Sequence, residues 1–224
     1  MLNKKNIAGF LLLLIASATS HAEDLEDAVE AMRHGDFAEA YCIMRPLADS
    51  GDADAQYNIG WMYLNGYGLR INDILALEWW QKAVAQGHRD ASFSIGMLYS
   101  LGEGEVSKNS DKAIDYYLIA ADDGHEDAVA ILKNMLQRDD RYIRNRLYDM
   151  IRERTAMFGV ERRVKARKLN ARSGPSTESK IVTQLLQGEK VLQVNKQGLW
   201  SQVVILANED IDHTVWVYNP LLEN

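Results

Sequence analysis

The sequence is poor in cysteine and in recognisable catalytic motifs. Cys42 is the only cysteine among 224 residues, so no internal disulfide can form even in an oxidising compartment. The longest apolar run, from Ile7 to Ala16, is too short for a comfortable membrane span. Gly-x-Ser-x-Gly, His-Glu-x-x-His and phosphate-loop patterns are missing, which argues against enzymes built on those motifs.

The remaining chemistry-bearing side chains are isolated. Cys42 lies in an apolar stretch, and we expect a small buried hydrophobe rather than a reactive thiol. Cys42 and His34 together are only a weak signal of a catalytic dyad. A hydrolase that uses Cys42 stays open as an alternative. His213 stands near Asp210 and Asp212, where a solvated loop is expected rather than a metal site. We therefore predict no catalytic residue, no metal, no cofactor and no enzyme activity.

The amino terminus has the pattern of an export signal. Lys4 and Lys5 precede the apolar run, and Ser20-His21-Ala22 is a small-x-small cleavage site. This pattern predicts a bacterial secretory signal peptide over 1–22. We expect a periplasmic or secreted protein that begins at Glu23 and has no integral membrane span after cleavage.

Charge is distributed unevenly along the chain. Residues 23–137 carry a net charge of −13, whereas residues 138–172 carry +7. Because the whole chain is acidic, with a net charge of −7, we do not expect a nucleic-acid partner. The basic segment, 138–159, is predicted to contain an amphipathic linker or capping helix at about 140–158. Attraction of an acidic partner or an anionic membrane surface by its arginines is the alternative.

One stretch of sequence occurs twice. The first half of the unit repeats after 36 residues and the second half after 37, with one residue inserted in the loop. Self-similarity at this period indicates stacked repeats, which usually present a binding surface rather than an active site. The repeated residues are Ala55/Ala91, Ile59/Ile95, Gly60/Gly96, Tyr63/Tyr99, Gly66/Gly102, Gly68/Gly104, then Ala76/Ala113, Trp79/Tyr116, Trp80/Tyr117, Ala83/Ala120, Gly87/Gly124 and His88/His125.

The spacing within a unit predicts two antiparallel helices. Apolar residues fall at i, i+4, i+7 and i+8 in the first helix and at i, i+3, i+4 and i+7 in the second. Asp73 and Ser110 are predicted to cap the second helix of each unit at its amino end, and Gly87 and Gly124 to end it. We interpret the mid-helix Gly60 and Gly96 as points of close approach between packed helices.

These residues resemble the Sel1-like repeat, a relative of the tetratricopeptide repeat. The resemblance rests on Ala-Gln-Tyr-Asn-Ile-Gly-Trp-Met-Tyr at 55–63, the Gly-Tyr-Gly loop at 66–68 and Ala-Leu-Glu-Trp-Trp-Gln-Lys-Ala at 76–83. It implies a helical solenoid over 23–137 that binds a protein through its groove. Half-units are expected on both sides, and Lys133, in place of a glycine, suggests that the stack ends in a polar capping helix. The candidate partner-binding residues are Tyr57, Trp61, Trp79 and Phe93.

After Gly159 the pattern changes to alternating β-runs. Five short runs separated by turn residues predict a small barrel over 160–224. Leu169-Asn170-Ala171-Arg172-Ser173-Gly174-Pro175, Gly188-Glu189, Trp200 and Trp216 resemble the bacterial Src-homology-3 (SH3) family. Val215 and an acidic insertion over 207–213 depart from the family pattern.

The two resemblances together predict a multidomain protein: an α/α helical-repeat solenoid followed by a small SH3-like β-barrel. The SH3 family implies binding of cell-wall peptides or of envelope proteins. Candidate ligand-binding residues are Arg172, Ser173, Trp200, Trp216 and Tyr218, although barrel core is the more expected place for Trp216. The favoured function is a non-catalytic envelope scaffold or adaptor with two ligands; the alternative is a peptidoglycan-binding protein that localises or regulates a cell-wall enzyme.

Overall fold

The computed structural model describes residues 23–102, 104–137, 146–147, 150–151, 154–206 and 214–223. The predicted signal peptide over 1–22, most of the basic segment and the acidic insertion therefore lie outside the described residues. The chain divides into two compact units between Gly124 and His125, and each is described by itself. The predicted domain boundaries at 137/138 and 159/160 stay predictions.

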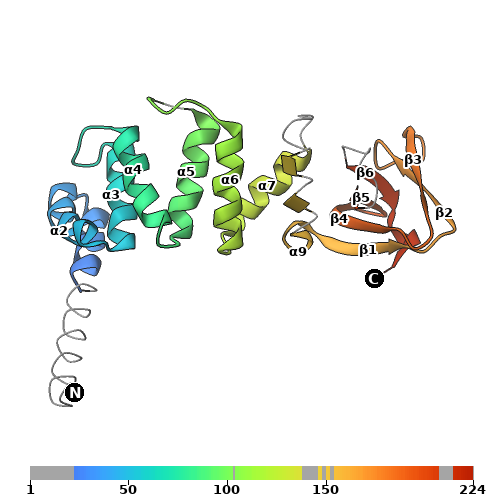
Figure 1. The fold of residues 1–224 in the computed structure, drawn as a ribbon, viewed down its shortest axis with the longest axis horizontal. Helices are drawn as coiled ribbons and strands as arrows, with labels where there is room; N and C mark the ends of the chain where they lie inside the picture. Colours follow the sequence, from blue (N-terminus) through green and yellow to red (C-terminus); the bar gives the residue numbers. More distant parts are fainter. Residues whose placement is uncertain are drawn as a thin grey trace, which may run out of the picture. The chain divides into compact units, whose positions relative to one another are not determined.

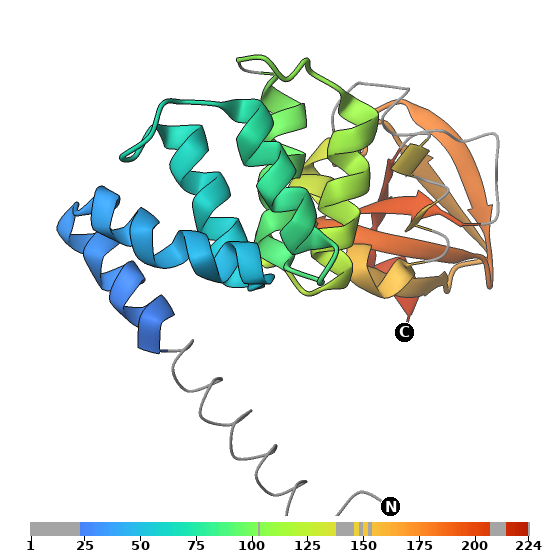
Figure 2. The same ribbon diagram turned by 60° about the vertical axis from the view of Figure 1, so that its left-hand side comes forward.

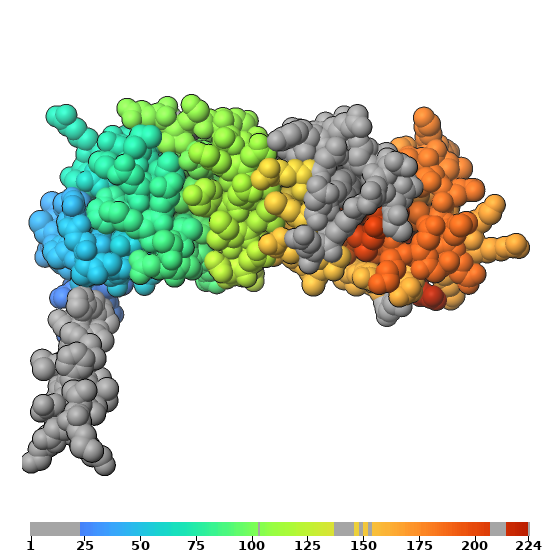
Figure 3. All heavy atoms as spheres, in the orientation of Figure 1, coloured from blue at the N-terminus to red at the C-terminus, as the bar shows by residue number. Residues whose placement is uncertain are grey.

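The first unit consists of α-helices. A helical segment over 23–34 precedes α2 (Phe37–Ser50), α3 (Ala53–Asn65), α4 (Asp73–Val84), α5 (Arg89–Leu101) and α6 (Ser110–Asp122). The loops that join α3 to α4 and α5 to α6 lie along the same edge of this unit, the upper edge in Figures 1 and 2. Side chains fill the spaces between these helices, as the space-filling view shows (Figure 3). The two tandem helix pairs confirm the predicted repeat.

Asparagine side chains, not the predicted Asp73 and Ser110, cap the second helix of each repeat. The Asn72 side chain accepts a hydrogen bond from the Leu75 amide (2.8 Å), and the Asn109 side chain accepts one from Lys112 (3.0 Å). An asparagine at this position satisfies one of the amides that the helix start leaves unpaired. The prediction was wrong by one residue at both sites.

The two repeated histidines cap the helix that follows them. Nδ1 of His88 accepts a hydrogen bond from the Ala91 amide at 3.1 Å, and Nδ1 of His125 accepts one from Ala128 at 3.4 Å. Asp52 makes the same contact with Ala55 one repeat earlier, at 2.7 Å. The glycines before the two histidines, Gly87 and Gly124, take the left-handed conformation as predicted (φ 80° and 84°).

Each mid-helix glycine makes room for an aromatic ring. A Cβ on Gly60 would lie 2.6 Å from two atoms of the Trp80 ring, and a Cβ on Gly96 would lie 2.7 Å from the Tyr117 ring. Trp80 and Tyr117 are both 1% exposed. The predicted close approach is confirmed, and the partner is the side chain of the facing helix.

The half-unit predicted before the repeats is also present. Helix α2 buries Ala40 and Leu47 and ends at Gly51, whose φ is 106°. The second loop glycine of the first repeat, Gly68, lies against Phe37 at the start of α2: a Cβ there would be 3.1 Å from the Phe37 Cβ. The loop of the first repeat therefore contacts α2, the helix of the half-unit before it.

The second unit begins with helical segments. Helix α7 (Glu126–Gln137) buries Ala128 and Leu132; that it caps the repeat stack stays a prediction. The predicted helix over 140–158 is not continuous, because Arg154 leaves the helical conformation (φ −126°, ψ 42°) before the short α9 (Thr155–Phe158). Leu147 and Ile151, within it, are fully buried.

A seven-stranded antiparallel sheet completes this unit. The described strands are β1 (Val160–Val164), β2 (Lys168–Arg172), β3 (Ile181–Leu186), β4 (Lys190–Gln197), β5 (Trp200–Ile205), β6 (Val215–Tyr218) and β7 (Leu222–Glu223). Their order is β3-β2-β6-β5-β4-β1-β7. The sheet thus has seven described strands where five were predicted. Alternate residues such as Leu169, Val203 and Val217 form one core on the inner face.

Candidate functional site

A hollow of about 610 Å³ lies beside helices α3 and α5, and we call it the groove. Its volume is within the range of ligand-binding pockets. Each helix contributes a stripe at four-residue spacing, which places its members on one helix face. The stripes are Tyr57, Trp61 and Asn65 on α3 and Phe93, Met97 and Leu101 on α5; Leu64, Ile71, Asp73, Trp80, Ser94, Leu98 and Gly104 complete the lining.

The groove exposes large apolar side chains to solvent. Ile71 is 68% exposed, Leu101 54% and Met97 37%. Single exposed apolar residues are ordinary on soluble proteins, but a cluster around a hollow marks an interaction site. The groove therefore has the surface expected of a docking site for an apolar ligand.

Three polar side chains of the groove are already bonded within the protein. Nε1 of Trp80 donates to the Tyr57 carbonyl (3.0 Å), and Nδ2 of Asn65 donates to the Trp61 carbonyl (2.9 Å). The buried Asp73 carboxylate accepts from the Glu105 amide at 3.2 Å. These bonds reduce the number of polar groups that could pair with a ligand.

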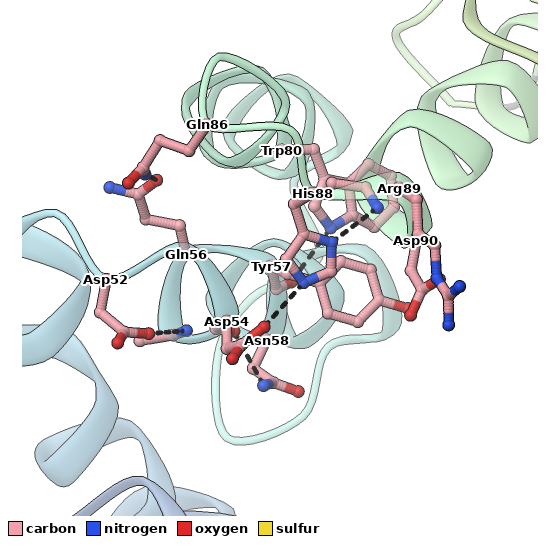
Figure 4. Close-up of polar contacts among 12 residues, drawn as sticks. Asp52, Asp54, Gln56, Tyr57, Asn58, Trp80, Gln86, His88, Arg89 and Asp90 are labelled. Atoms are coloured by element: carbon pink, nitrogen blue, oxygen red, sulfur yellow. Dashed lines mark hydrogen bonds and ion pairs between the residues drawn. The ribbon is translucent and has the colours of Figure 1, made fainter. Parts of the chain in front are cut away.

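Two rings pack against Tyr57 (Figure 4). Its ring stacks on His88, with centroids 4.7 Å apart, and on Trp80, at 6.5 Å. His88 is fixed in turn, because Nε2 lies 3.1 Å from the Asp54 carboxylate while Nδ1 caps α5. Burial raises the pKa of the Tyr57 hydroxyl, an effect that a hydrogen bond with Ser94 opposes. This wall of the groove is thus preorganised.

The structure brings together three of the four residues predicted for the helical repeats. Tyr57, Trp61 and Phe93 line the groove. Trp79 lies elsewhere: it is 6% exposed and packs in the core with Met44 and other residues of the preceding helices. Nζ of Lys82 lies 3.6 Å from its ring centroid. Trp79 therefore packs against the preceding helices and does not line the groove.

Sequence reasoning missed the apolar residues that complete the groove. Met97 and Leu101 continue the stripe of Phe93 at four-residue intervals, so helical spacing alone was enough to find them. Ile71 lies in the loop before α4, where the sequence gives no periodic signal. Its 68% exposure is visible only in the folded chain.

A smaller hollow of about 260 Å³ lies on the sheet, and we call it the sheet pocket. Arg172, Trp200 and Tyr218 line it together with Lys168, Leu169, Asn170, Thr177 and Leu221. The Trp200 and Tyr218 rings meet edge to face at 5.8 Å. Nη1 of Arg172 donates to the Ser179 carbonyl at 2.7 Å, which fixes the guanidinium at the pocket.

The other two residues predicted for the sheet do not line this pocket. Ser173 is exposed in the turn after β2. Trp216 is half-buried, and it points away from the core because its neighbours Val215 and Val217 point inward. The expectation that Trp216 fills the barrel core was therefore wrong. It pairs across strands with Arg172, which places both on the outer face.

The isolated side chains considered for catalysis are not assembled into a site. Cys42 is exposed, so its predicted burial was wrong. His34 contacts Glu30, with Nε2 2.9 Å from the carboxylate. In the described part of the chain, no three His, Cys, Asp or Glu side chains are grouped so that they could hold a metal ion. His213 lies outside the described residues.

Comparisons with known families agree with both halves of this architecture. The Sel1 repeat model matches residues 53–88 and 89–125, and the bacterial SH3 domain model matches 167–223. The chain carries two Sel1 repeats and a bacterial SH3 domain. Sel1 repeats stack into surfaces suited to protein binding, and bacterial SH3 domains suggest binding of the cell wall.

Curated relatives match part of the chain. The chain is 34% identical over 100 residues to the ERAD-associated E3 ubiquitin-protein ligase component HRD3B of Arabidopsis thaliana, which covers 44% of this chain and 15% of that protein. This chain spans only a small part of the length of the curated relatives that it matches.

A solved structure supports the solenoid fold. A protective antigen present in uropathogenic Escherichia coli strains, displaying an SLR fold, is 26% identical with a TM-score of 0.51, covering 63% of this chain and 32% of that one. A Sel1 repeat protein from Oxalobacter formigenes is 23% identical with a TM-score of 0.48, covering 58% and 60%.

Proposed function

We propose that this protein is a non-catalytic adaptor of the bacterial envelope whose Sel1 groove binds a protein partner. The observation that carries the proposal is the cluster of exposed Ile71, Met97 and Leu101 around a preorganised aromatic wall. Burying about 100 Å² of such apolar surface on a partner contributes on the order of 2–3 kcal/mol. The SH3 domain holds a second ligand in the sheet pocket.

The envelope location rests on the predicted signal peptide over 1–22. Bacterial SH3 domains and Sel1 repeats are compatible with a protein outside the cytoplasm. In the part of the chain that the structure describes, no helix has the length and apolar character needed to cross a membrane.

Capture of partners by groove variants tests this function. Met97→Lys places a charge in the groove, whereas Ile119→Lys changes a residue of α6 that is similarly exposed (41% against 37%) and does not line the groove. We expect immobilised wild type and Ile119→Lys to retain the same envelope proteins and Met97→Lys to lose at least one of them. Identical retention by all three would contradict a role for the groove.

A second function, peptidoglycan binding, is favoured by the composition of the sheet pocket. Arg172 offers a guanidinium for a carboxylate, and Trp200 and Tyr218 offer ring faces. Peptidoglycan stem peptides carry free carboxylates. Strong, saturable cosedimentation of the protein with purified cell wall, lost in Arg172→Ala and kept in the groove variant Met97→Lys, would support this alternative. No cosedimentation of the wild type would remove it.

A further inference from the structure

We infer that the occupant of the groove is an amphipathic α-helix whose polar flanks are basic. This inference rests on the proposed function and names the chemistry of the partner. It follows from two properties of the groove: how its polar atoms are used, and which charges surround it.

The first property selects a helix. An extended peptide brings unpaired backbone N–H and C=O groups, which are costly to bury without partners. The groove offers little to pair with them, because Trp80, Asn65 and Asp73 already bond to the protein's own backbone. Its walls are helices, so no strand edge is available for β-pairing. A helix satisfies its own backbone groups and needs only to bury an apolar face.

The dimensions of the groove agree with a helix. The stripes on α3 and α5 repeat every four residues, a rise of about 6 Å. The apolar face of a bound helix repeats at i, i+3, i+4 and i+7, which is nearly the same period. Side chains of the guest can therefore fit between those of both walls, as ridges fit into grooves when helices pack.

The second property selects a basic helix. Among the residues that the structure describes, Asp73 is the only charged one that lines the groove, and no basic side chain lines it. Residues 53–125, which form the two repeats, hold 10 acidic and 5 basic side chains. This excess of negative charge in the repeats favours partners of the opposite sign and disfavours like-charged ones. Lysine or arginine at the flanks of the guest helix suits these surroundings.

Designed peptides provide the probe. The test peptide is an 18-residue helix of Leu, Ala and Lys with leucine at i, i+3, i+4 and i+7. Three controls keep its length: a scrambled sequence without an apolar face, a version with two central prolines, and one with every Lys replaced by Glu. Titration calorimetry with the whole protein measures affinity. We expect the test peptide to bind at least about tenfold more tightly than each control, a margin that corresponds to a single well-placed interaction.

Variants of the protein locate the bound peptide. Met97→Lys is expected to weaken binding of the test peptide at least about tenfold, because it adds a charge to the apolar wall and repels lysine. Ile119→Lys is expected to leave the affinity within about twofold, since its effect is limited to surface charge. Circular dichroism of both proteins checks that they remain folded.

Several outcomes would overturn the inference. Absence of binding, equal binding of the proline peptide, or equal binding of the Glu peptide would exclude the basic helix, and unchanged binding by Met97→Lys would place the peptide elsewhere. A wild-type dimer that Met97→Lys dissociates would show that a second copy occupies the groove. If the test peptide does not bind while the immobilised Met97→Lys variant still fails to retain an envelope protein, the proposed function stands. Only the inferred chemistry of the partner is then wrong.

Discussion

The two Sel1 repeats are the same in their packing and different along the groove. Each repeat places an aromatic ring of its second helix, Trp80 or Tyr117, against a glycine of its first helix, Gly60 or Gly96. The same pair of positions is thus filled by residues of the same kind. Capping follows the same rule, with asparagine before α4 and α6.

The groove positions follow a looser rule. Tyr57 is matched by Phe93, Trp61 by Met97 and Asn65 by Leu101. The stripe of the first repeat carries side chains that can form hydrogen bonds, whereas the stripe of the second repeat is apolar. The side chains that pack between helices are therefore matched in kind between the two repeats. The side chains of the groove are matched less closely, as expected where side chains adapt to a ligand.

Removing the buried aromatic ring of either repeat should have the largest effect, and it tests whether the two rings have the same packing role. Trp80→Ala and Tyr117→Ala should each lower the free energy of unfolding by about 3–5 kcal/mol, because a large aromatic side chain leaves a cavity. Urea unfolding followed by circular dichroism measures the change. A cost below about 1 kcal/mol in one repeat only would show that the two rings do not have equivalent packing roles.

Replacing the glycine is the next largest test. Gly60→Ala and Gly96→Ala should each cost about 1–2 kcal/mol, since overpacking against the ring exceeds the helix propensity that alanine gains. In the background of Trp80→Ala, Gly60→Ala should instead stabilise the protein by up to about 1 kcal/mol. If Gly60→Ala destabilises both backgrounds equally in a double-mutant cycle, the ring is not the reason for the glycine.

The caps give a smaller effect and separate adjacent residues. Asn72→Ala and Asn109→Ala should each cost about 1 kcal/mol, because a helix amide loses its partner. Ser110→Ala, one residue further along, should change stability by less than about 0.5 kcal/mol. Thermal or urea unfolding of the three variants compares them directly, and a larger loss for Ser110→Ala would return the cap to the position that sequence reasoning chose.

The groove substitution should have the smallest effect on stability. Met97→Lys and Ile119→Lys replace residues of similar exposure on helices of the same repeat, and each should change the free energy of unfolding by no more than about 0.5 kcal/mol. Unfolding curves measured at the same salt concentration test this. A large loss in Met97→Lys alone would mean that Met97 acts in packing, and the groove would then need a different test variant.

Sequence alone predicted the helical repeats well because period and packing are coupled. The residues that recur after 36 or 37 positions are those that pack between helices, such as Gly96 and Tyr117. Adjacent tryptophans were harder to assign. Trp79 faces the preceding helices and Trp80 faces α3, and both are compatible with the same apolar stripe. The neighbouring helices decide which of the two lines the groove.

Local rules failed where a tertiary contact competes for the side chain. Asp73 is an acceptable helix cap by type, but its carboxylate accepts a hydrogen bond from Glu105 in the next repeat, and Asn72 takes the cap. In the sheet, the alternation of Val215 and Val217 was sufficient to place Trp216 outside the core. The two-residue β7 follows Pro220 and is too short for a recognisable pattern.

Site-specific photocrosslinking from the groove tests the adaptor most directly. A benzoylphenylalanine at position 97 contacts whatever occupies the groove, and the same group at position 119 reports on an equally exposed site outside it. In intact cells that produce the protein naturally, we predict a discrete covalent adduct with one partner from position 97 and none from position 119. No adduct from position 97, or the same adduct from both positions, would contradict the account.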